Sequence, residues 1–137
     1  MAITFVPNAG TVLMCDFTGF IPPEMTKVRH VVVISPRGRS VNIKNGTCLV
    51  VPFSTQPPIH REPYHLLMPA GVYPFFRADK EVWAKANLIT HVSFGRLDRV
   101  IVNNRHTHAA LNPDDFKRIK QGVLHAIGLG LLTDRVE

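Results

Sequence analysis

The sequence predicts a mainly β fold of the α+β class, in which a small antiparallel, barrel-like sheet is followed by one C-terminal helix. Several short β-rich runs come first along the chain, and a single helical pattern comes last. Strands and helices do not alternate, so a parallel sheet of β-α units is not expected. The 137 residues can bury one core without staples, and we expect a single domain over residues 1–137.

The first strand is expected at residues 11–17, where β-rich residues follow a turn at Gly10. A loop over residues 18–23 comes next. Its paired prolines, Pro22 and Pro23, stiffen the approach to Glu24 because proline fixes its own φ and restricts the residue before it. A rigid loop is a suitable mount for a polar group that must hold its position.

Two apolar runs, at residues 31–34 and 48–53, are the clearest strand candidates. The first is β-branched throughout and apolar on both faces, as in a central strand. The connection between them carries Arg37, Arg39 and Lys44. Such a loop is either a set of solvated cations or a rim that follows a phosphate backbone, and the residue types leave both readings open.

Residues 56–74 are too rich in proline to form a helix, so we expect a long excursion over the surface. Further strands are expected at residues 83–87, 88–94 and 100–102, with a turn at residues 103–105.

The C-terminal helix has the clearest local signal. Asn112 is a good N-cap, Pro113 suits the first helical position, and two aspartates follow at the positive end of the helix dipole. Apolar residues then recur at spacings of three and four, which makes one face that should pack on the sheet: Phe116, Ile119, Val123, Ile127 and Leu131. Leu131 and Leu132 are candidates for contact with a partner subunit.

Composition limits the partners and the location. The 16 Lys and Arg residues against 10 Asp and Glu residues give a net charge of +6, which favours RNA, DNA or an acidic protein segment, although a plain basic protein has the same balance. Cys15 and Cys48 lie in apolar runs and do not make a disulfide framework. No secretion signal and no apolar run of ~18 residues is visible, so we expect a cytoplasmic protein without a membrane segment.

Several chemistries have no motif in the chain. The phosphate-loop, dinucleotide, zinc-ribbon and nucleophile-elbow patterns are missing. His106 and His108 are weak evidence for a metal because no third ligand lies nearby. We therefore expect neither a metal nor a cofactor.

Polar residues gather instead at the ends of the two apolar runs. Glu24 and Arg29 precede the first, and Ser54 and Thr55 follow the second. A carboxylate, a guanidinium and a hydroxyl at one sheet edge could bind or cleave a phosphodiester. The structural alternative is a salt bridge in a turn and a hydroxyl that caps a strand.

In this order of residues the chain resembles the MazF/PemK family of toxins from bacterial toxin–antitoxin pairs. That family has an acidic residue five positions before an arginine that opens a strand of the type R-P-V-V-V-I-S, and later a strand of the type C-L-V-V-P-x-[ST]-T. The matches here are Glu24, Arg29, residues 31–35 and residues 48–55, with His30 in place of the usual proline.

The resemblance implies an SH3-like barrel, a homodimer and a sequence-selective endoribonuclease that cuts single-stranded RNA. The ribose 2′-OH would attack the adjacent phosphorus without a metal, leaving a 2′,3′-cyclic phosphate and a free 5′-OH. An acidic antitoxin protein would neutralise the enzyme by filling its basic RNA groove.

The resemblance also assigns roles by position. Arg29 would stabilise the phosphorane, Ser54 would hydrogen-bond the phosphate, and Glu24 would be the base or would orient Arg29. The residues expected to contact RNA are Thr55, Arg37, Arg39, Lys85, Asn87 and Arg96.

One departure from the family puts the base in doubt. Some members carry an Arg-x-Asp whose aspartate is the proposed base, and its counterpart here is Lys85-Ala86-Asn87, where an asparagine cannot take a proton. Those members also have a histidine where this chain has Pro23. The base is then Glu24 or Asp98, or the protein binds RNA and cuts poorly. An inactive RNA-binding module and a gyrase-poisoning toxin on the same fold are the remaining alternatives.

Overall fold

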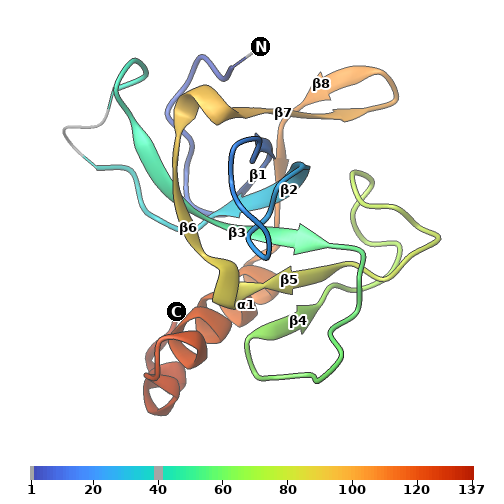
Figure 1. Cartoon of the computed structure of the whole chain (residues 1–137), viewed down its shortest axis with the longest axis vertical. Helices are drawn as coiled ribbons and strands as arrows, with labels where there is room; N and C mark the ends of the chain where they lie inside the picture. The colour runs from blue at the N-terminus through green and yellow to red at the C-terminus, as the bar shows by residue number, and fades with distance from the viewer. Residues whose placement is uncertain (1, 39–41) are drawn as a thin grey trace.

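A curved antiparallel sheet with one long helix packed at its end makes up the chain (Figure 1). The computed structural model describes residues 2–38 and 42–137. Within them, the strands are β1 (Thr11–Asp16), β2 (Val28–Val33), β3 (Thr47–Ser54), β4 (His65–Leu67), β5 (Trp83–Lys85), β6 (Thr90–Ser93), β7 (Leu97–Val102), β8 (Arg105–Thr107) and β9 (Ala109–Ala110). The helices are α1 (Pro113–Ala126) and the 3₁₀ helices η1 (Ala86–Leu88), η2 (Phe94–Arg96) and η3 (Gly130–Arg135).

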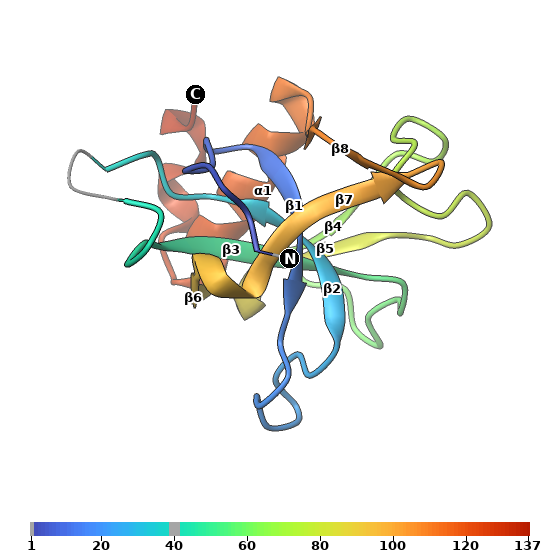
Figure 2. The same cartoon turned by 90° about the horizontal axis from the view of Figure 1, so that it is seen from above.

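The strand order is β4-β5-β3-β2-β1-β7-β8, with β6 paired to β3 and β9 paired to β1. All pairings are antiparallel. The sheet curls strongly, and β6 runs through η2 directly into β7 (Figure 2). The predicted mainly β class with a C-terminal helix is confirmed, but among the described residues the strand path ends at β4 and β8 without closing.

Strand β2 is buried on both faces, as predicted for a central strand. Because successive side chains point to opposite faces, Val31 and Val33 lie in one apolar cluster with Leu13, whereas Val32 lies in a second cluster with Val51. A shift of one residue would exchange the two sets, so the register with β1 and β3 is strongly specified. The strand begins at Val28, three residues earlier than the apolar run indicates.

Strand β3 changes partner along its length. Residues 47–50 pair with β6, and Phe53 and Ser54 pair with β5. The fully buried Pro52 lies beside this change, opposite Val31 of β2. Proline has no N–H to donate, so a site where the ladder on one side is interrupted accommodates it within a central strand.

The segment 56–74 is only partly the surface excursion that its prolines predict. It contains β4, and Met68 and Tyr73 are buried in the core. The Tyr73 hydroxyl donates to Asp115 Oδ2 at 2.6 Å and accepts from the Asn112 N–H at 3.1 Å. These contacts with the start of α1 draw the segment inward, so the prediction of a plain surface loop was wrong here.

Helix α1 begins as predicted, with the Asn112 side chain accepting a hydrogen bond from the Asp115 N–H at 2.8 Å. It lies against η1 and β4 (Figure 1), and Gly122 permits this contact because a Cβ there would meet Leu66 Cδ2 at 2.5 Å. The predicted apolar stripe does not continue past Ala126. Gly128 has φ +82° and the chain turns into η3, which leaves Leu131 97% exposed.

The predicted strand 83–87 ends at Lys85, and η1 replaces its last part. The predicted turn at residues 103–105 is present, with positive φ at Asn103 and Asn104. Within the described part of the chain, no helix combines the length and apolar character that a membrane crossing requires.

Candidate functional site

Arg29 and Ser54 lie at the same end of the β2–β3 pair and line one hollow. The β2–β3 ladder ends at the Val31–Pro52 pair, and beyond it Arg29 pairs with Cys15 of β1 and Ser54 with Trp83 of β5. Both residues lie where the two-strand pair ends, one at the start of β2 and the other at the end of β3. The structure therefore brings together the guanidinium and the hydroxyl that the sequence predicted as a pair.

Arg29 Nε is buried and has no hydrogen-bond partner among the described residues. A buried N–H without an acceptor costs about 1–3 kcal/mol, so native proteins rarely leave one. Trp83 Nε1 is the other such nitrogen in the described structure, beneath the guanidinium of Arg61. An unsatisfied guanidinium N–H beside a hydroxyl is an arrangement suited to an anionic ligand.

Ser54 is 8% exposed, and its Oγ accepts a hydrogen bond from the Gln56 N–H at 3.1 Å. A serine hydroxyl can accept and donate at the same time. Because this bond uses an acceptor lone pair, the O–H remains able to donate to a ligand.

A hollow of about 240 Å³ opens at this end of the sheet. It is lined by Arg29, Ser54 and Thr55 together with Met14, Val28, His30, Phe53, Phe76, Arg77 and Val82. Among the described lining residues, arginine supplies both permanent charges, and none is a carboxylate. Three of the predicted site residues, Arg29, Ser54 and Thr55, thus share one hollow.

Arg77 is a residue of this hollow that the sequence reasoning missed. It lies on the segment between β4 and β5, far along the chain from Arg29, and its side chain is 60% exposed. Arg77 Nε and Nη2 bind the two carboxylate oxygens of Asp79 at 3.0 and 2.8 Å. The one sequence feature that could have indicated Arg77 is its position directly after two phenylalanines, in a loop that otherwise has no apolar periodicity.

His30 follows Arg29 on β2 and also lines the hollow. Its ring lies 5.4 Å from that of Phe76 and 6.4 Å from that of Phe75. Burial lowers the pKa of His30, and a hydrogen bond to the Phe75 backbone opposes that shift. A neutral imidazole at pH 7 leaves the positive charge of the hollow to the two arginines.

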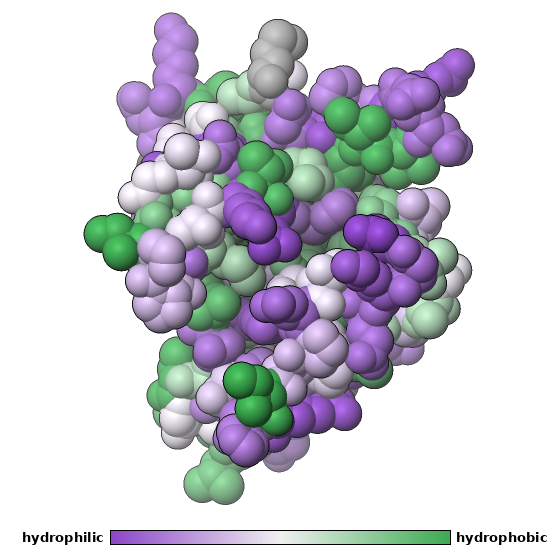
Figure 3. Space-filling model, turned by 45° about the vertical axis from the view of Figure 1, so that its right-hand side comes forward, coloured by the Kyte–Doolittle hydropathy of each residue, from purple (hydrophilic) through white to green (hydrophobic). Residues whose placement is uncertain are grey.

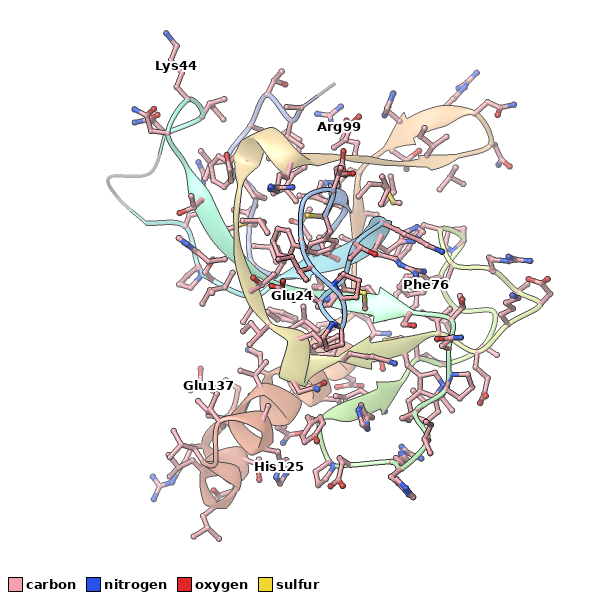
Figure 4. All side chains as sticks on the ribbon, in the orientation of Figure 1. Glu24, Lys44, Phe76, Arg99, His125 and Glu137 are labelled. Atoms are coloured by element: carbon pink, nitrogen blue, oxygen red, sulfur yellow. The ribbon has the colours of Figure 1, made fainter. Side chains whose placement is uncertain are left out.

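Glu24 borders a different hollow, of about 180 Å³, which it shares with Asn87. The β1–β2 loop that carries Glu24 stands out from the sheet (Figure 2), and Figure 4 shows Glu24 well apart from Phe76. Its Oε1 accepts a hydrogen bond from the Ile21 N–H at 2.9 Å, and its own N–H donates to the Ile21 carbonyl at 2.9 Å. The structure therefore joins Glu24 with Asn87 rather than with Arg29.

Arg96 holds the same loop. Its Nη1 donates to the carbonyl oxygens of Asp16 and Thr18 at 2.8 and 2.9 Å, and its guanidinium lies 5.1 Å from the centre of the Phe20 ring. These contacts give Arg96 a structural task, and its predicted contact with RNA stays a prediction.

The other predicted residues lie apart from one another. Arg37 is exposed on the β2–β3 connection, Lys85 ends β5 opposite His65, and Arg39 lies outside the described residues. Asp98, the alternative base, borders a separate hollow with Arg99 and His106, and its Oδ1 accepts from the Arg99 N–H at 2.8 Å. The structure does not bring Asp98 to the hollow of Arg29.

Neither metal nor thiol chemistry has a clear place in the described residues. They contain no group of three or more His, Cys, Asp or Glu side chains that could hold a metal ion. Burial raises the pKa of Cys15 to about 12 and that of Cys48 to about 11, so both remain thiols at neutral pH.

Comparison with known proteins decides the family. A family model described as "PemK-like, MazF-like toxin of type II toxin-antitoxin system" matches residues 8–127. The chain belongs to this toxin family. It is also 32% identical to the YifN protein of Escherichia coli (strain K12), over 93% of this chain and 95% of the relative. The resemblance seen in the two strand motifs is thereby confirmed.

Solved structures show the same fold. Deinococcus radiodurans MazF matches with a TM-score of 0.64 at 18% identity, covering 90% of this chain and 98% of that one. A mycobacterial endoribonuclease in complex with its cognate antitoxin matches with a TM-score of 0.63 at 16% identity, covering 90% and 97%. At these identities the likeness establishes the family fold and leaves the site to be argued from this chain's own residues.

Proposed function

We propose that the protein is a toxin-type endoribonuclease that cuts single-stranded RNA in a sequence-selective way. The ribose 2′-OH attacks the adjacent phosphorus, the P–O5′ bond breaks, and the products carry a 2′,3′-cyclic phosphate and a 5′-OH. Membership of the toxin family and the fold shared with proteins described as endoribonucleases support this proposal. The observation that carries it is the Arg29–Ser54 pair, which borders a hollow with an unsatisfied guanidinium N–H.

Arg29 acts electrostatically in this proposal. Negative charge grows on the non-bridging oxygens as the phosphorane forms, and a fixed guanidinium in a partly dry site stabilises that charge. Its pKa, above ~12, makes it a poor proton donor. Ser54 donates its O–H to the same phosphate, whereas Arg77 at the rim of the hollow is already paired with Asp79.

Glu24 is the proposed base for the 2′-OH. The bond from the Ile21 N–H to Oε1 holds the carboxylate in a hollow other than that of Arg29, so the proposal requires the β1–β2 loop to bring Glu24 within reach of the 2′-OH when RNA binds. The reaction needs a base, a donor for the leaving oxygen and positive charge near phosphorus. Glu24 takes the proton of the 2′-OH, Arg29 supplies the positive charge, and a solvent water gives a proton to the leaving O5′, so the proposal includes neither a metal nor a cofactor.

The partners follow from the charge and from the family. A net charge of +6 suits both RNA and an acidic antitoxin segment, and a mycobacterial neighbour is described in complex with its cognate antitoxin. We place the protein in the cytoplasm, where messenger RNA is its substrate, and Thr55, Arg37 and Lys85 among its RNA contacts. We also propose a homodimer, for which the exposed Leu131 and Leu132 offer apolar surface.

A second candidate is a module that binds RNA on this fold and does not cut it. It is favoured by the position of Glu24, whose Oε1 is engaged in the β1–β2 loop and whose hollow is not that of Arg29. Asn87, its neighbour there, cannot replace it as a base.

Cleavage of a mixed-sequence single-stranded RNA in the presence of EDTA tests the proposal. We expect the wild-type protein to give cyclic-phosphate products and Arg29→Ala to lose at least ~100-fold in rate, as when one oxyanion donor is removed. Arg105→Ala, which removes an exposed arginine on β8, is the matched control and should cut normally. RNA binding without cleavage by the wild type would instead support the second candidate.

A further inference from the structure

A further hollow, of about 490 Å³, lies between the 68–82 segment and the start of α1. This volume falls within the ~300–1,000 Å³ range of small-molecule sites. Its apolar walls come from Leu67, Met68, Tyr73, Phe76 and Val82, and Arg77 and Arg118 are among its polar residues. We call it the loop cavity.

The loop cavity adjoins the hollow of Arg29 and Ser54. Phe76, Arg77 and Val82 line both. An RNA strand whose phosphate lies at Arg29 would therefore have a neighbouring nucleotide at the shared wall. Figure 3, which brings forward the side of the molecule that carries this segment, shows mostly hydrophilic side chains with hydrophobic ones between them.

The polar groups in the wall of the loop cavity already satisfy one another. Asp115, which is 6% exposed, accepts from the Tyr73 hydroxyl at 2.6 Å and from Arg118 Nη1 at 3.2 Å. Arg118 Nη2 also donates to the Leu67 carbonyl at 3.1 Å. Burial, followed by the hydrogen bond to Asp115, raises the pKa of Tyr73 to about 12, so the phenol stays protonated. The wall is thus a preformed surface and does not need a ligand to complete it.

The loop cavity and the Arg29 hollow differ in the net charge of the side chains that line them. Three cations that line the loop cavity, Arg77, Lys80 and Arg118, face three carboxylates, those of Asp79, Glu81 and Asp115. Among the described residues that line the Arg29 hollow there is no carboxylate, and because Arg77 is already paired with Asp79, Arg29 is the cation left there for a ligand. A phosphate is therefore favoured at Arg29, whereas the balanced loop cavity favours an uncharged, flat and largely apolar group.

We infer that the loop cavity receives the nucleobase of a nucleotide next to the scissile phosphate and makes that position one at which the protein selects its RNA. This inference rests on the proposed RNA-cleaving function. Unstacked bases of single-stranded RNA are commonly recognised by stacking on aromatic side chains, and the half-buried Phe76 offers such a surface, with the buried Tyr73 packed against its ring.

The test fills the loop cavity and removes one base at a time. Ala70 and Ala78 are exposed and line the cavity, so Ala70→Trp and Ala78→Trp should block it without disturbing the core. Ala9→Trp, at an exposed position that lines neither hollow, is the matched control. Each protein is assayed for kcat/KM on short RNAs that carry an abasic residue at each position in turn.

For the wild type and Ala9→Trp, we expect one abasic position beside the cut to lower kcat/KM about tenfold, within the range for a stacked base. In both cavity variants the intact RNA should already be cut about tenfold less efficiently, and the abasic change should have no further effect. Cavity variants that retain the full abasic effect, or a wild type indifferent to every abasic position, would overturn the inference.

If the proposed cleavage function is wrong, the experiment gives a different result from the one expected if only the base site is wrong. If the wild type cuts no RNA, the same abasic series is measured as binding of 2′-deoxy oligonucleotides by fluorescence anisotropy. A position-specific loss of affinity that Ala70→Trp and Ala78→Trp abolish would still support a base site, and identical binding profiles for all four proteins would overturn it.

Discussion

The Arg29 hollow and the Glu24 hollow differ in how their polar groups are held. The first is formed largely by β2 and β3, whose register is specified by burial on both faces, and it contains a guanidinium N–H without a partner among the described residues. The second lies under the β1–β2 loop, where Glu24 Oε1 and Arg96 bind backbone groups of the loop itself. Unsatisfied hydrogen-bonding capacity, rather than residue type, distinguishes the better ligand site.

The two arginines make the same contrast. Arg29 was predicted to stabilise the phosphorane, and Arg96 was predicted to contact the RNA. Arg96 Nη1 satisfies two carbonyl oxygens that are 78 and 80 residues away in sequence, whereas Arg29 Nε has no acceptor. Arg96 therefore stabilises the fold, but its Nη1 is not free to bind RNA. Arg29 keeps a free N–H for a ligand, but burying that N–H without an acceptor among the described residues destabilises the fold.

The largest effect on cleavage rate that would test the contrast between the two hollows is expected for a substitution at Glu24. In Glu24→Gln the amide oxygen can still accept from the Ile21 N–H, but the side chain can no longer take a proton. If Glu24 is the base, single-turnover cleavage should slow by ~100-fold or more while RNA affinity is unchanged. Asn87→Ala, in the same hollow, is the control and should be nearly silent. A near-normal rate for Glu24→Gln would reduce Glu24 to a residue that positions the loop.

A smaller effect, on stability, should sharpen the contrast between the arginines. Arg96→Ala removes two hydrogen bonds from a charged donor and should lower the free energy of unfolding by about 1–3 kcal/mol, as measured by urea denaturation. Arg29→Ala removes a buried N–H that has no partner and should be neutral or slightly stabilising. Arg99→Ala, whose guanidinium packs over the Phe5 ring, is the control and should cost less than about 1 kcal/mol. Equal losses at Arg29 and Arg96 would remove the distinction.

The parts of the fold that the sequence predicts are those governed by local pattern. Uninterrupted β-branched residues placed β2 in the centre of the sheet, and Asn112 with Pro113 placed the start of α1. The prolines of residues 56–74 indicated an irregular segment, but burial of Met68 and Tyr73 depends on contacts with α1 that no local pattern encodes. The end of α1 was missed because the apolar spacing continues past the turn at Gly128.

For the candidate site, too, the residues set by local pattern were predicted and those set by the fold of distant segments were not. Arg29 and Ser54 were predicted together because one precedes and the other follows a recognisable apolar run, and the pairing of β2 with β3 brings these ends to one hollow. Arg77 was missed because it reaches the hollow through the fold of a distant loop. The separation of Glu24 from Arg29 could not be foreseen, since five residues of sequence do not determine on which side of a sheet a loop lies.

The central claim is that Arg29 and Ser54 act on the same phosphate, and a double-mutant cycle tests it most directly. Single-turnover cleavage is measured for the wild type, Arg29→Lys, Ser54→Ala and the double variant, with Arg29→Lys and Arg105→Ala as the uncoupled reference pair. The account predicts a coupling free energy of about 1 kcal/mol or more between Arg29 and Ser54, as for groups that share one partner. Additivity within about 0.3–0.5 kcal/mol, equal to that of the reference pair, would contradict it.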